Sequence, residues 1–362
     1  MIKRKKIADA FSIAAGGMLF FAVFLSLGYA LCPETLLGGA SHSPAAFLGR
    51  GFVWVGSLGW DHPGIVLSIC LGLGLSEEFH VSQALLSFLS YEVLAHGMSQ
   101  FLPYSLARAD VPYAFLGMLG AFSSSLIFRH VLKEPCDYWK RLGKAALFSI
   151  AVSWVSAGLF SIVWPFLYDR ISTLGSFCAD GSVSGAFWFH VSEQLLAPFG
   201  MERGLNRMVW NSESGLGDLS YFWARKTSEE VSWPLGLYMS GFFPIMMGGI
   251  PSACAVHQKH DGNRRWGLIG LVSFLGGMVL PYEYLLLVHP LLYAGFCFSY
   301  GISAVLADLC SFRAGFASGG GFADFFFSGV MPASKNPQML VVLGTLAAAC
   351  YGLIASFRTR KK

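Results

Sequence analysis

Charged side chains lie inside or directly beside apolar stretches of this sequence that are long enough to enter a membrane. Glu193 lies in the apolar segment 185–199, and Glu283 follows the apolar segment 266–280 almost at once. Intramembrane charges are costly, so they face a protein interior or a water-filled cavity and mark the path of a substrate or an ion. These residues therefore indicate a site for a polar solute within the membrane.

The stretch 237–284 gives the strongest signal for the elements that would position such a site. Two apolar segments flank the polar loop 259–265. The helix-breaking residues within the two segments are Pro244, Gly248, Gly249, Pro251, Gly276, Gly277 and Pro281. Broken backbone at membrane depth is tolerated only where it is buried in protein or lines a cavity, and paired broken segments are typical of the midplane site of a secondary transporter. The alternative is a pair of kinked spans whose glycines only allow close helix packing.

The composition is that of a polytopic membrane protein. Of the 362 residues, 54% are hydrophobic and 13% are charged, and the mean hydropathy is +0.56. A membrane-spanning helix needs roughly 20 apolar residues, so we expect an all-α fold with about 8–11 transmembrane segments, including broken helices and re-entrant hairpins. The net charge of +4 comes from basic clusters at membrane edges and does not indicate binding of nucleic acid.

The sequence predicts no metal, no cofactor and no catalytic residue. The eight cysteines are scattered without a C-x-x-C pair, so we expect them to be reduced and structural. Neither H-E-x-x-H nor G-x-S-x-G is present, and the serines and histidines have no convincing triad spacing. A membrane-embedded hydrolase is therefore not supported.

Basic residues set the expected orientation in the membrane. A cluster at residues 3–6 precedes the apolar segment 10–31, which we interpret as a transmembrane helix because it is long for a signal peptide and no clear cleavage site follows it. The basic loop 129–144 and the basic end 358–362 are expected on the same side as the first cluster. Both termini are therefore predicted to be cytoplasmic.

Two further stretches differ from simple spans. Residues 200–234 are too charged to cross the membrane and too aromatic for a free linker, so we expect them to fold partly into the protein or to lie at the membrane interface. Residues 307–334 contain three consecutive glycines and are expected to form a re-entrant or broken element. Asp308, Arg313 and Asp324 should then turn inward, with Asp324 fixing a hairpin.

Several motifs, in order and at the right separations, resemble those of the membrane (IIC) component of the bacterial sugar phosphotransferase system, in its glucose superfamily. Residues 241–253 (GFFPIMMGGIPSA) resemble the family's GFFPIMMFGLPAA, and residues 272–284 (VSFLGGMVLPYEY) resemble its TSFLTGITEPIEF. Residues 195–206 (LLAPFGMERGLN) resemble LLIPFGLHHxLN. The resemblance covers residues 145–357 well and residues 1–144 loosely.

The resemblance implies a homodimeric sugar permease of the bacterial cytoplasmic (inner) membrane. Residues 1–168 would form a scaffold and dimerisation part, and residues 169–362 a transport part that binds one sugar and moves against the scaffold in the manner of an elevator. In the family, a cysteine-phosphorylated IIB unit phosphorylates the sugar on the cytoplasmic side. Because the sequence ends in a basic tail directly after its last apolar segment, we expect the IIB and IIA proteins to be separate chains.

The departures from the family pattern fall on positions where the family holds its sugar. The family's His-His reads Glu202-Arg203, and the glutamate of its Thr-Glu-Pro reads Leu280. In the family that histidine and glutamate are understood to bond sugar hydroxyls, and losing two such partners would cut affinity by roughly 10². The candidate substrate-binding residues are Glu193, Glu202, Arg203, Asn206 and Glu283.

Alternatives remain open for two of these sites. Glu202 and Arg203 could form a polar pair in the pocket or could neutralise each other structurally. Glu283 could line the cavity, as its match to the family implies, or could be a helix-terminal carboxylate paired with a backbone N–H or an arginine.

Three functions are compatible with the sequence. The leading hypothesis is a sugar-permease subunit for a hexose or a hexose-containing sugar, phosphorylated by a separate IIB chain. The alternatives are a degenerate IIC homologue that acts as a membrane sensor or regulatory subunit, and a solute carrier that works without phosphorylation. No phosphoryl-accepting residue is identified, so any enzyme activity would belong to the complex.

Overall fold

The computed structural model describes residues 4–32, 43–76, 80–102, 110–131, 137–213 and 215–360. Lys3 and residues 132–136, which belong to the predicted basic clusters, lie outside the described residues. Within the described ranges helices are joined by turns and loops, and the only β-structure there is one isolated bridge between Arg313 and Lys335. The predicted all-α class is confirmed.

The elements follow one another in this order. They are α1 Arg4–Leu31, α2 Pro44–Trp60, α3 Pro63–Leu75, α4 His80–Phe101, α5 Tyr113–Val131, α6 Tyr138–Cys178, α7 Val183–Leu196, η3 Ala197–Phe199, α8 Arg203–Trp210, α9 Asp218–Trp223, α10 Ser228–Val231, α11 Leu237–Ser240, α12 Phe242–Pro244, η4 Ile245–Gly249, α13 Ile250–Asp261, α14 Arg264–Gly276, α15 Leu280–Leu286, α16 Pro290–Leu309, α17 Phe322–Ser328 and α18 Met339–Arg360.

The described helices differ in their capacity to cross a membrane. Six are long and apolar enough, and the pair α2–α3, bent by 64°, could add a seventh span. The segments 185–199 and 266–280, which resemble spans in the sequence, form the helices α7 and α14 of 14 and 13 residues. Neither reaches the roughly 20 residues that a single crossing needs, so the described crossings are fewer than the expected segments.

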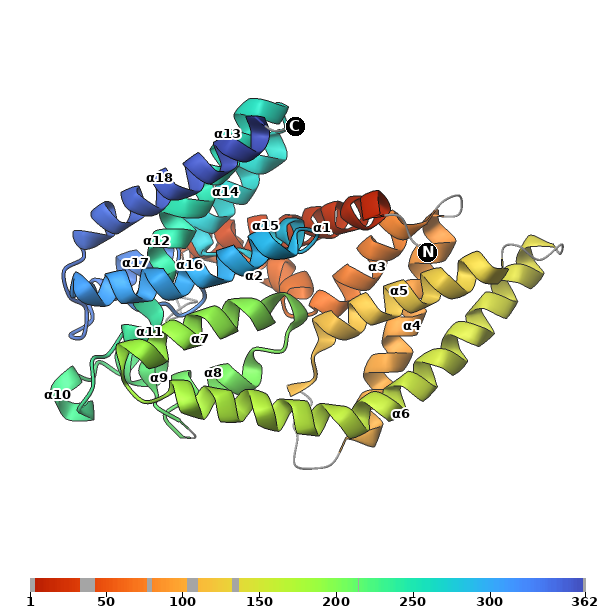
Figure 1. Cartoon of the computed structure of the whole chain (residues 1–362), viewed down its shortest axis with the longest axis horizontal. Helices are drawn as coiled ribbons and strands as arrows, with labels where there is room; N and C mark the ends of the chain where they lie inside the picture. The colour runs from red at the N-terminus through yellow and green to blue at the C-terminus, as the bar shows by residue number, and fades with distance from the viewer. Residues whose placement is uncertain are drawn as a thin grey trace.

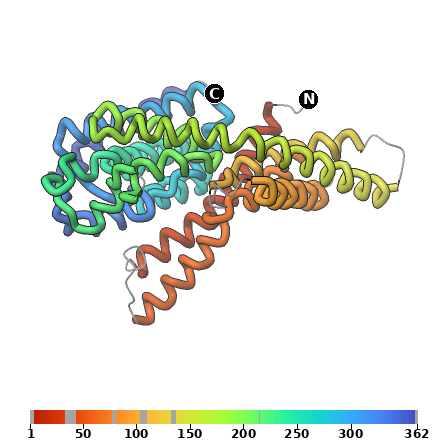
Figure 2. Tube along the Cα trace, turned by 90° about the horizontal axis from the view of Figure 1, so that it is seen from below, coloured from red at the N-terminus to blue at the C-terminus, as the bar shows by residue number. Residues whose placement is uncertain are grey.

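The helices gather at two ends of an elongated molecule (Figure 1). α3, α4 and α5 lie at one end, α7 to α18 lie toward the other, and the 41 residues of α6 run along both. The α1–α2 hairpin projects from the body (Figure 2). α1 also packs against α14 and α15, and there Arg265 Nη1 donates to Ser12 Oγ at 2.7 Å. The two halves therefore share an interface along α1.

The glycines of both broken segments allow close approach of backbones. η4 is a π-helical turn, and such turns within helices frequently mark functional sites. A Cβ atom on Gly248 would lie 2.2 Å from the carbonyl oxygen of Gly344, so α18 contacts η4 directly. Gly277 ends α14 with a φ of +67°, and a Cβ there would lie 2.5 Å from the amide nitrogen of Gly320. The break between α14 and α15 thus meets the triple-glycine run.

The glycine-rich segment 307–334 folds back on itself through its own polar groups. The Asp324 carboxylate accepts a hydrogen bond from the N–H of Ala317 at 2.6 Å, and Arg313 pairs with Asp308. Asp324 is almost completely buried. It therefore fixes the hairpin, as the sequence predicts.

The aromatic and charged stretch folds partly into the protein, through α8 and α9, whereas α10 has no buried residue. The fully buried Asp218 carboxylate accepts the N–H groups of Gly236 and Tyr238 at 2.6 and 2.8 Å. Trp223 Nε1 donates to the backbone oxygen of Phe316 at 2.9 Å. Asp218 thereby fixes the turn that begins the broken helix 237–261.

Candidate functional site

α7 places Glu193 and Gln194 at its C-terminal end. Ser182 begins the helix by accepting the N–H of Gly185 at 3.0 Å, which satisfies an amide that the helix itself cannot. The chain then passes through η3 and turns at Gly200, whose φ of +67° lies in the left-handed region that glycine adopts without strain. Glu193 and Gln194 are 8% and 2% exposed, so both side chains face the protein interior.

Two other short elements contribute the remaining acidic residues. Glu202 precedes α8 as its N-cap residue, and Asn206 follows one turn later, which places both on one side of the helix. Glu283 lies in the first turn of α15, directly after the backbone break, and Pro281 is the second residue of that helix, where its ring-fixed φ suits the first turn. The Glu283 side chain is fully buried.

These elements bring four of the five candidate residues together. The Glu193 carboxylate accepts a hydrogen bond from Gln194 Nε2 at 2.7 Å and another from the Asn206 side chain. The Glu283 carboxyl lies close enough to those of Glu193 and Glu202 for their charges to interact. We call the group of Glu193, Gln194, Glu202, Asn206 and Glu283 the acidic cluster.

The acidic cluster holds more hydrogen-bond acceptors than donors. Some buried side-chain oxygens in it have no partner within the described part of the chain: both carboxylate oxygens of Glu283, Oε2 of Glu202, Oε1 of Gln194 and Oδ1 of Asn206. Each buried polar group left unsatisfied costs about 1–3 kcal/mol. A ligand that presents several O–H or N–H donors would remove this cost, so the chemistry of the cluster matches a polyhydroxylated solute.

α16 forms the adjoining wall with groups that the candidate set does not include. Tyr293 donates its hydroxyl to the backbone of α7 at 2.5 Å. The Tyr300 hydroxyl has no hydrogen-bond partner among the residues that the structure describes, and it lies within electrostatic range of Glu283 and Glu193. On α7, His190 is fully buried, and no described residue forms a hydrogen bond with its Nε2. The lone histidine in an apolar segment was a signal for His190, whereas nothing in the sequence distinguishes Tyr300 from other tyrosines.

Arg203 is the candidate residue that lies outside the acidic cluster. It is exposed, and it lines a cavity of 350 Å³ together with Glu202 and Leu280. Trp60 and Tyr113 complete this cavity from the N-terminal half. The volume falls within the roughly 300–1,000 Å³ of small-molecule sites. Glu202 therefore belongs both to the buried cluster and to the wall of a cavity between the two halves.

Burial raises the pKa of the Glu202 carboxyl to about 7, against the opposing effects of a backbone hydrogen bond and of Arg203. Because this pKa lies above its ordinary value, the favourable contribution of the group to the free energy of unfolding is complete at acid pH and is lost as the pH rises through about 7. We expect Glu202→Gln to raise the melting temperature at pH 8 by roughly 2–8 °C, and the gain to fall toward zero near pH 4.5.

Thermal unfolding in detergent at both pH values checks this expectation. Glu213→Gln, at an exposed carboxylate in the loop after α8, is the matched control and should leave the melting temperature unchanged. An equal gain for Glu202→Gln at both pH values would contradict the assigned titration.

Comparison with known proteins finds relatives that are all components of one kind of sugar transport system. No protein-family model matches the chain. The N-acetylglucosamine-specific EIICB component of the phosphotransferase system (PTS) of Bacillus subtilis (strain 168) is 26% identical over 312 residues, which cover 83% of this chain and 67% of that protein. The N-acetylglucosamine-specific EIICBA component of Escherichia coli (strain K12) is 27% identical over 322 residues, covering 83% of this chain and 48% of that protein. The chain belongs to the glucose superfamily of PTS IIC components.

This IIC chain spans about half the length of EIICBA relatives such as that of Escherichia coli, of which it covers 48%. The crystal structure of the transporter ChbC, the IIC component from the N,N'-diacetylchitobiose-specific phosphotransferase system, aligns with 99% of this chain at 16% identity and a TM-score of 0.40. The curated relatives and the apolar helices make this IIC chain a multi-pass protein of the inner membrane.

The matching and the divergent motif positions of this IIC chain overlap in space. Asn206 and Glu283, which match the motifs, lie in the acidic cluster. Leu280 and Arg203, which depart from them, lie on the wall of the 350 Å³ cavity. Glu202, which also departs from the motifs, belongs to both places, so the divergent positions lie in the acidic cluster as well as on the cavity wall.

Proposed function

We propose that this chain is the sugar-translocating subunit of a phosphotransferase system and takes a hexose of the N-acetylhexosamine type. The observation that carries the proposal is the acidic cluster, whose buried acceptors lack donors. A sugar ring presents several hydroxyl donors, and their hydrogen bonds to carboxylates are charge-assisted and therefore strong. The names of the Bacillus subtilis and Escherichia coli relatives support an N-acetylglucosamine-like substrate.

An elevator-type movement is supported by the cavity of 350 Å³ between the two halves. A second cavity, of 360 Å³, shares Asp61, Tyr113 and Arg203 with the cavity of 350 Å³. The second cavity is lined mostly by residues of the scaffold part, residues 1–168, whereas the cavity of 350 Å³ lies between the parts and leaves room for the transport part, residues 169–362, to slide against the scaffold. The boundary falls within α6, which is continuous to Cys178 and would connect the parts. We further propose that the scaffold dimerises and that both termini are cytoplasmic.

Transport by this chain would depend on separate phosphotransfer proteins. Inside-out membrane vesicles that carry the chain are supplied with labelled N-acetylglucosamine or glucose, with and without a phosphorylated IIB protein and its IIA partner. We expect saturable formation of labelled sugar phosphate only in the presence of phosphorylated IIB. Vesicles without the chain are the control. Absence of saturable uptake or phosphorylation for every hexose and disaccharide tried would reject the permease function.

A sensor or regulatory subunit is the second candidate, and Leu280 favours it. This apolar side chain lines the 350 Å³ cavity at the position where the resembling motif has a glutamate. A cavity that lost this carboxylate could retain binding in the acidic cluster while losing transport. Sugar-dependent thermal stabilisation without uptake would support the sensor, whereas uptake coupled to IIB would exclude it.

A further inference from the structure

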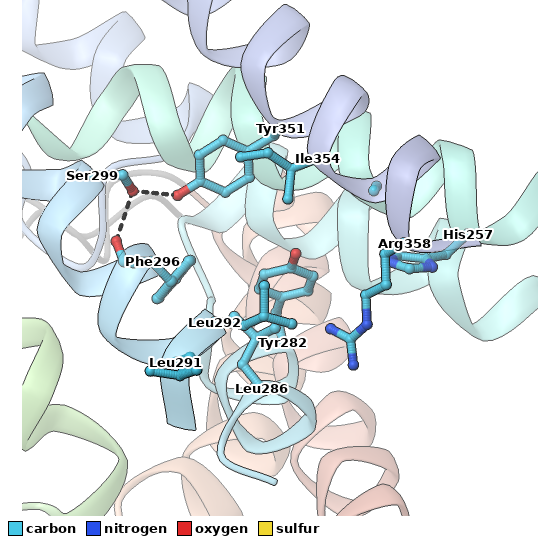
Figure 3. A pocket seen from close by; sticks show the side chains of 12 residues that line it. His257, Tyr282, Leu286, Leu291, Leu292, Phe296, Ser299, Tyr351, Ile354 and Arg358 are labelled. Atoms are coloured by element: carbon cyan, nitrogen blue, oxygen red, sulfur yellow. Dashed lines mark hydrogen bonds between the residues drawn. The ribbon is translucent and has the colours of Figure 1, made fainter. Parts of the chain in front are cut away.

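A further cavity, outside the acidic cluster, lies between α13, α15, α16 and α18 (Figure 3). It has a volume of 170 Å³, and most of its wall is apolar. Leu291 and Ile354 on this wall are 90% and 56% exposed. Both belong to helices that are long and apolar enough to span the membrane, near the start of α16 and the end of α18. The cavity therefore opens onto the lipid-facing surface near one edge of the membrane.

The cavity continues into a polar one of 180 Å³. The two share His257, Tyr282, Leu286 and Arg358. Figure 3 shows the Arg358 side chain extending from α18 into the hollow beside His257. In the described part of the chain, no carboxylate forms an ion pair with the Arg358 guanidinium.

The carboxylate that lines this polar end, Asp261, already has a hydrogen-bond partner in the protein. Asp261 accepts from His260 at a distance of 2.6 Å. Arg4 adds a further cation at the rim, since its Nη2 donates to the backbone oxygen of Val288 at 3.5 Å. The polar end of the composite cavity is therefore suited to an anion.

The lining does not suit a sugar. Of the three hydroxyl groups on the wall of the apolar cavity, those of Ser299 and Tyr351 bond to each other at 2.6 Å, and Ser299 also donates to the Phe296 backbone oxygen. A soluble anion would use only the polar end and would leave the apolar end open. The combination of an apolar slot at the lipid-facing surface with a cationic end fits a molecule that carries an acyl chain and a phosphate.

We propose that this composite cavity binds an anionic phospholipid, with one acyl chain between α16 and α18 and its phosphate at Arg358. Basic pockets between transmembrane helices are established sites for anionic headgroups. Tyr282 forms part of the wall, and its neighbour Glu283 belongs to the acidic cluster. A bound lipid therefore packs against the helix that carries Glu283. The inference does not depend on which solute occupies the acidic cluster.

Two substitutions separate the apolar end from the cationic end. A Cβ atom on Gly295, which lines the slot, meets no atom within 4 Å, so Gly295→Leu fills the slot without a clash at Cβ. Arg358→Gln removes the cation. Gly158→Leu is the matched glycine control, since Gly158 lies on α6 with equally open space. Arg170→Gln is the charge control, because Arg170 is exposed on α6 beside Phe166.

Native mass spectrometry of the full chain in a neutral detergent measures the lipid retained after addition of phosphatidylglycerol or phosphatidylcholine. We expect the chain to retain phosphatidylglycerol about fivefold better than phosphatidylcholine, and Arg358→Gln to abolish that preference. Gly295→Leu should lower retention of phosphatidylglycerol about tenfold, because the leucine side chain would displace at least two CH₂ groups of the lipid's acyl chain from the slot. Both control variants should behave as the unmodified chain.

Three results would overturn the proposal. The first is equal retention of the two lipids by the unmodified chain. The second is unchanged retention of phosphatidylglycerol in both cavity variants. The third is displacement of phosphatidylglycerol by millimolar inorganic phosphate, which would identify a simple anion site.

Discussion

Replacing Glu283 by glutamine is expected to weaken sugar binding by about 10- to 100-fold. Both carboxyl oxygens of Glu283 are buried and have no hydrogen-bond partner among the described residues, so they are available to hydroxyl groups of a ligand. Leaving a buried polar group without its hydrogen-bond partner costs about 1–3 kcal/mol, which corresponds to roughly this range of affinity. Glutamine preserves the size of the side chain but offers one oxygen and a donor in place of the second. Equilibrium binding of labelled N-acetylglucosamine to the purified chain measures the effect.

Controls separate loss of binding from loss of fold. Glu213→Gln removes an exposed carboxylate and should leave affinity unchanged. The melting temperature of Glu283→Gln should not fall, because the substitution removes a buried carboxylate without a described donor. Glu283→Asp retains the carboxylate but withdraws it, and an intermediate affinity is expected. Unchanged affinity in Glu283→Gln would place the sugar outside the acidic cluster.

Most members of the acidic cluster could be selected from the sequence, because they lie in recognisable motifs. Glu193, Glu202, Asn206 and Glu283 were selected by their charge within apolar surroundings and by their match or mismatch to family motifs. Physical pattern alone could not bring Glu193 and Glu283 together, because they are separated by several turns and breaks whose geometry depends on tertiary packing. Their roles toward a sugar stay a prediction.

Other features lay beyond the sequence for identifiable reasons. The number of crossings was hard to predict because hydropathy does not show where an apolar helix ends. α7 and α14 are apolar, but turns end them after 14 and 13 residues. The lipid-facing cavity joins His257 to Arg358, and no periodicity relates residues so far apart. Gly277 and Gly320 were noted as breakers, but their contact across the α14–α15 break is a property of the fold.

Gly248→Ala is expected to lower the melting temperature by roughly 4–10 °C. The added Cβ would lie 2.2 Å from the carbonyl oxygen of Gly344 and 2.9 Å from its Cα. These are backbone atoms of α18 and cannot rotate away, so η4 and α18 must separate. Gly344→Ala is the matched control in the same contact, because a Cβ on Gly344 meets no atom within 4 Å. Alanine also favours a helix over glycine, so this control should be neutral or stabilising.

The same pair of variants decides between the two interpretations of the broken segments. If the glycines serve only close packing of kinked spans, Gly248→Ala should lower thermal stability and leave the affinity for sugar unchanged in the folded fraction. If the π-turn also positions the solute site, the affinity should fall with the stability, because separation of η4 from α18 would displace the adjoining α16 and its Tyr300. Equal melting temperatures for Gly248→Ala and Gly344→Ala would contradict the direct contact between η4 and α18, on which both interpretations of this segment rest.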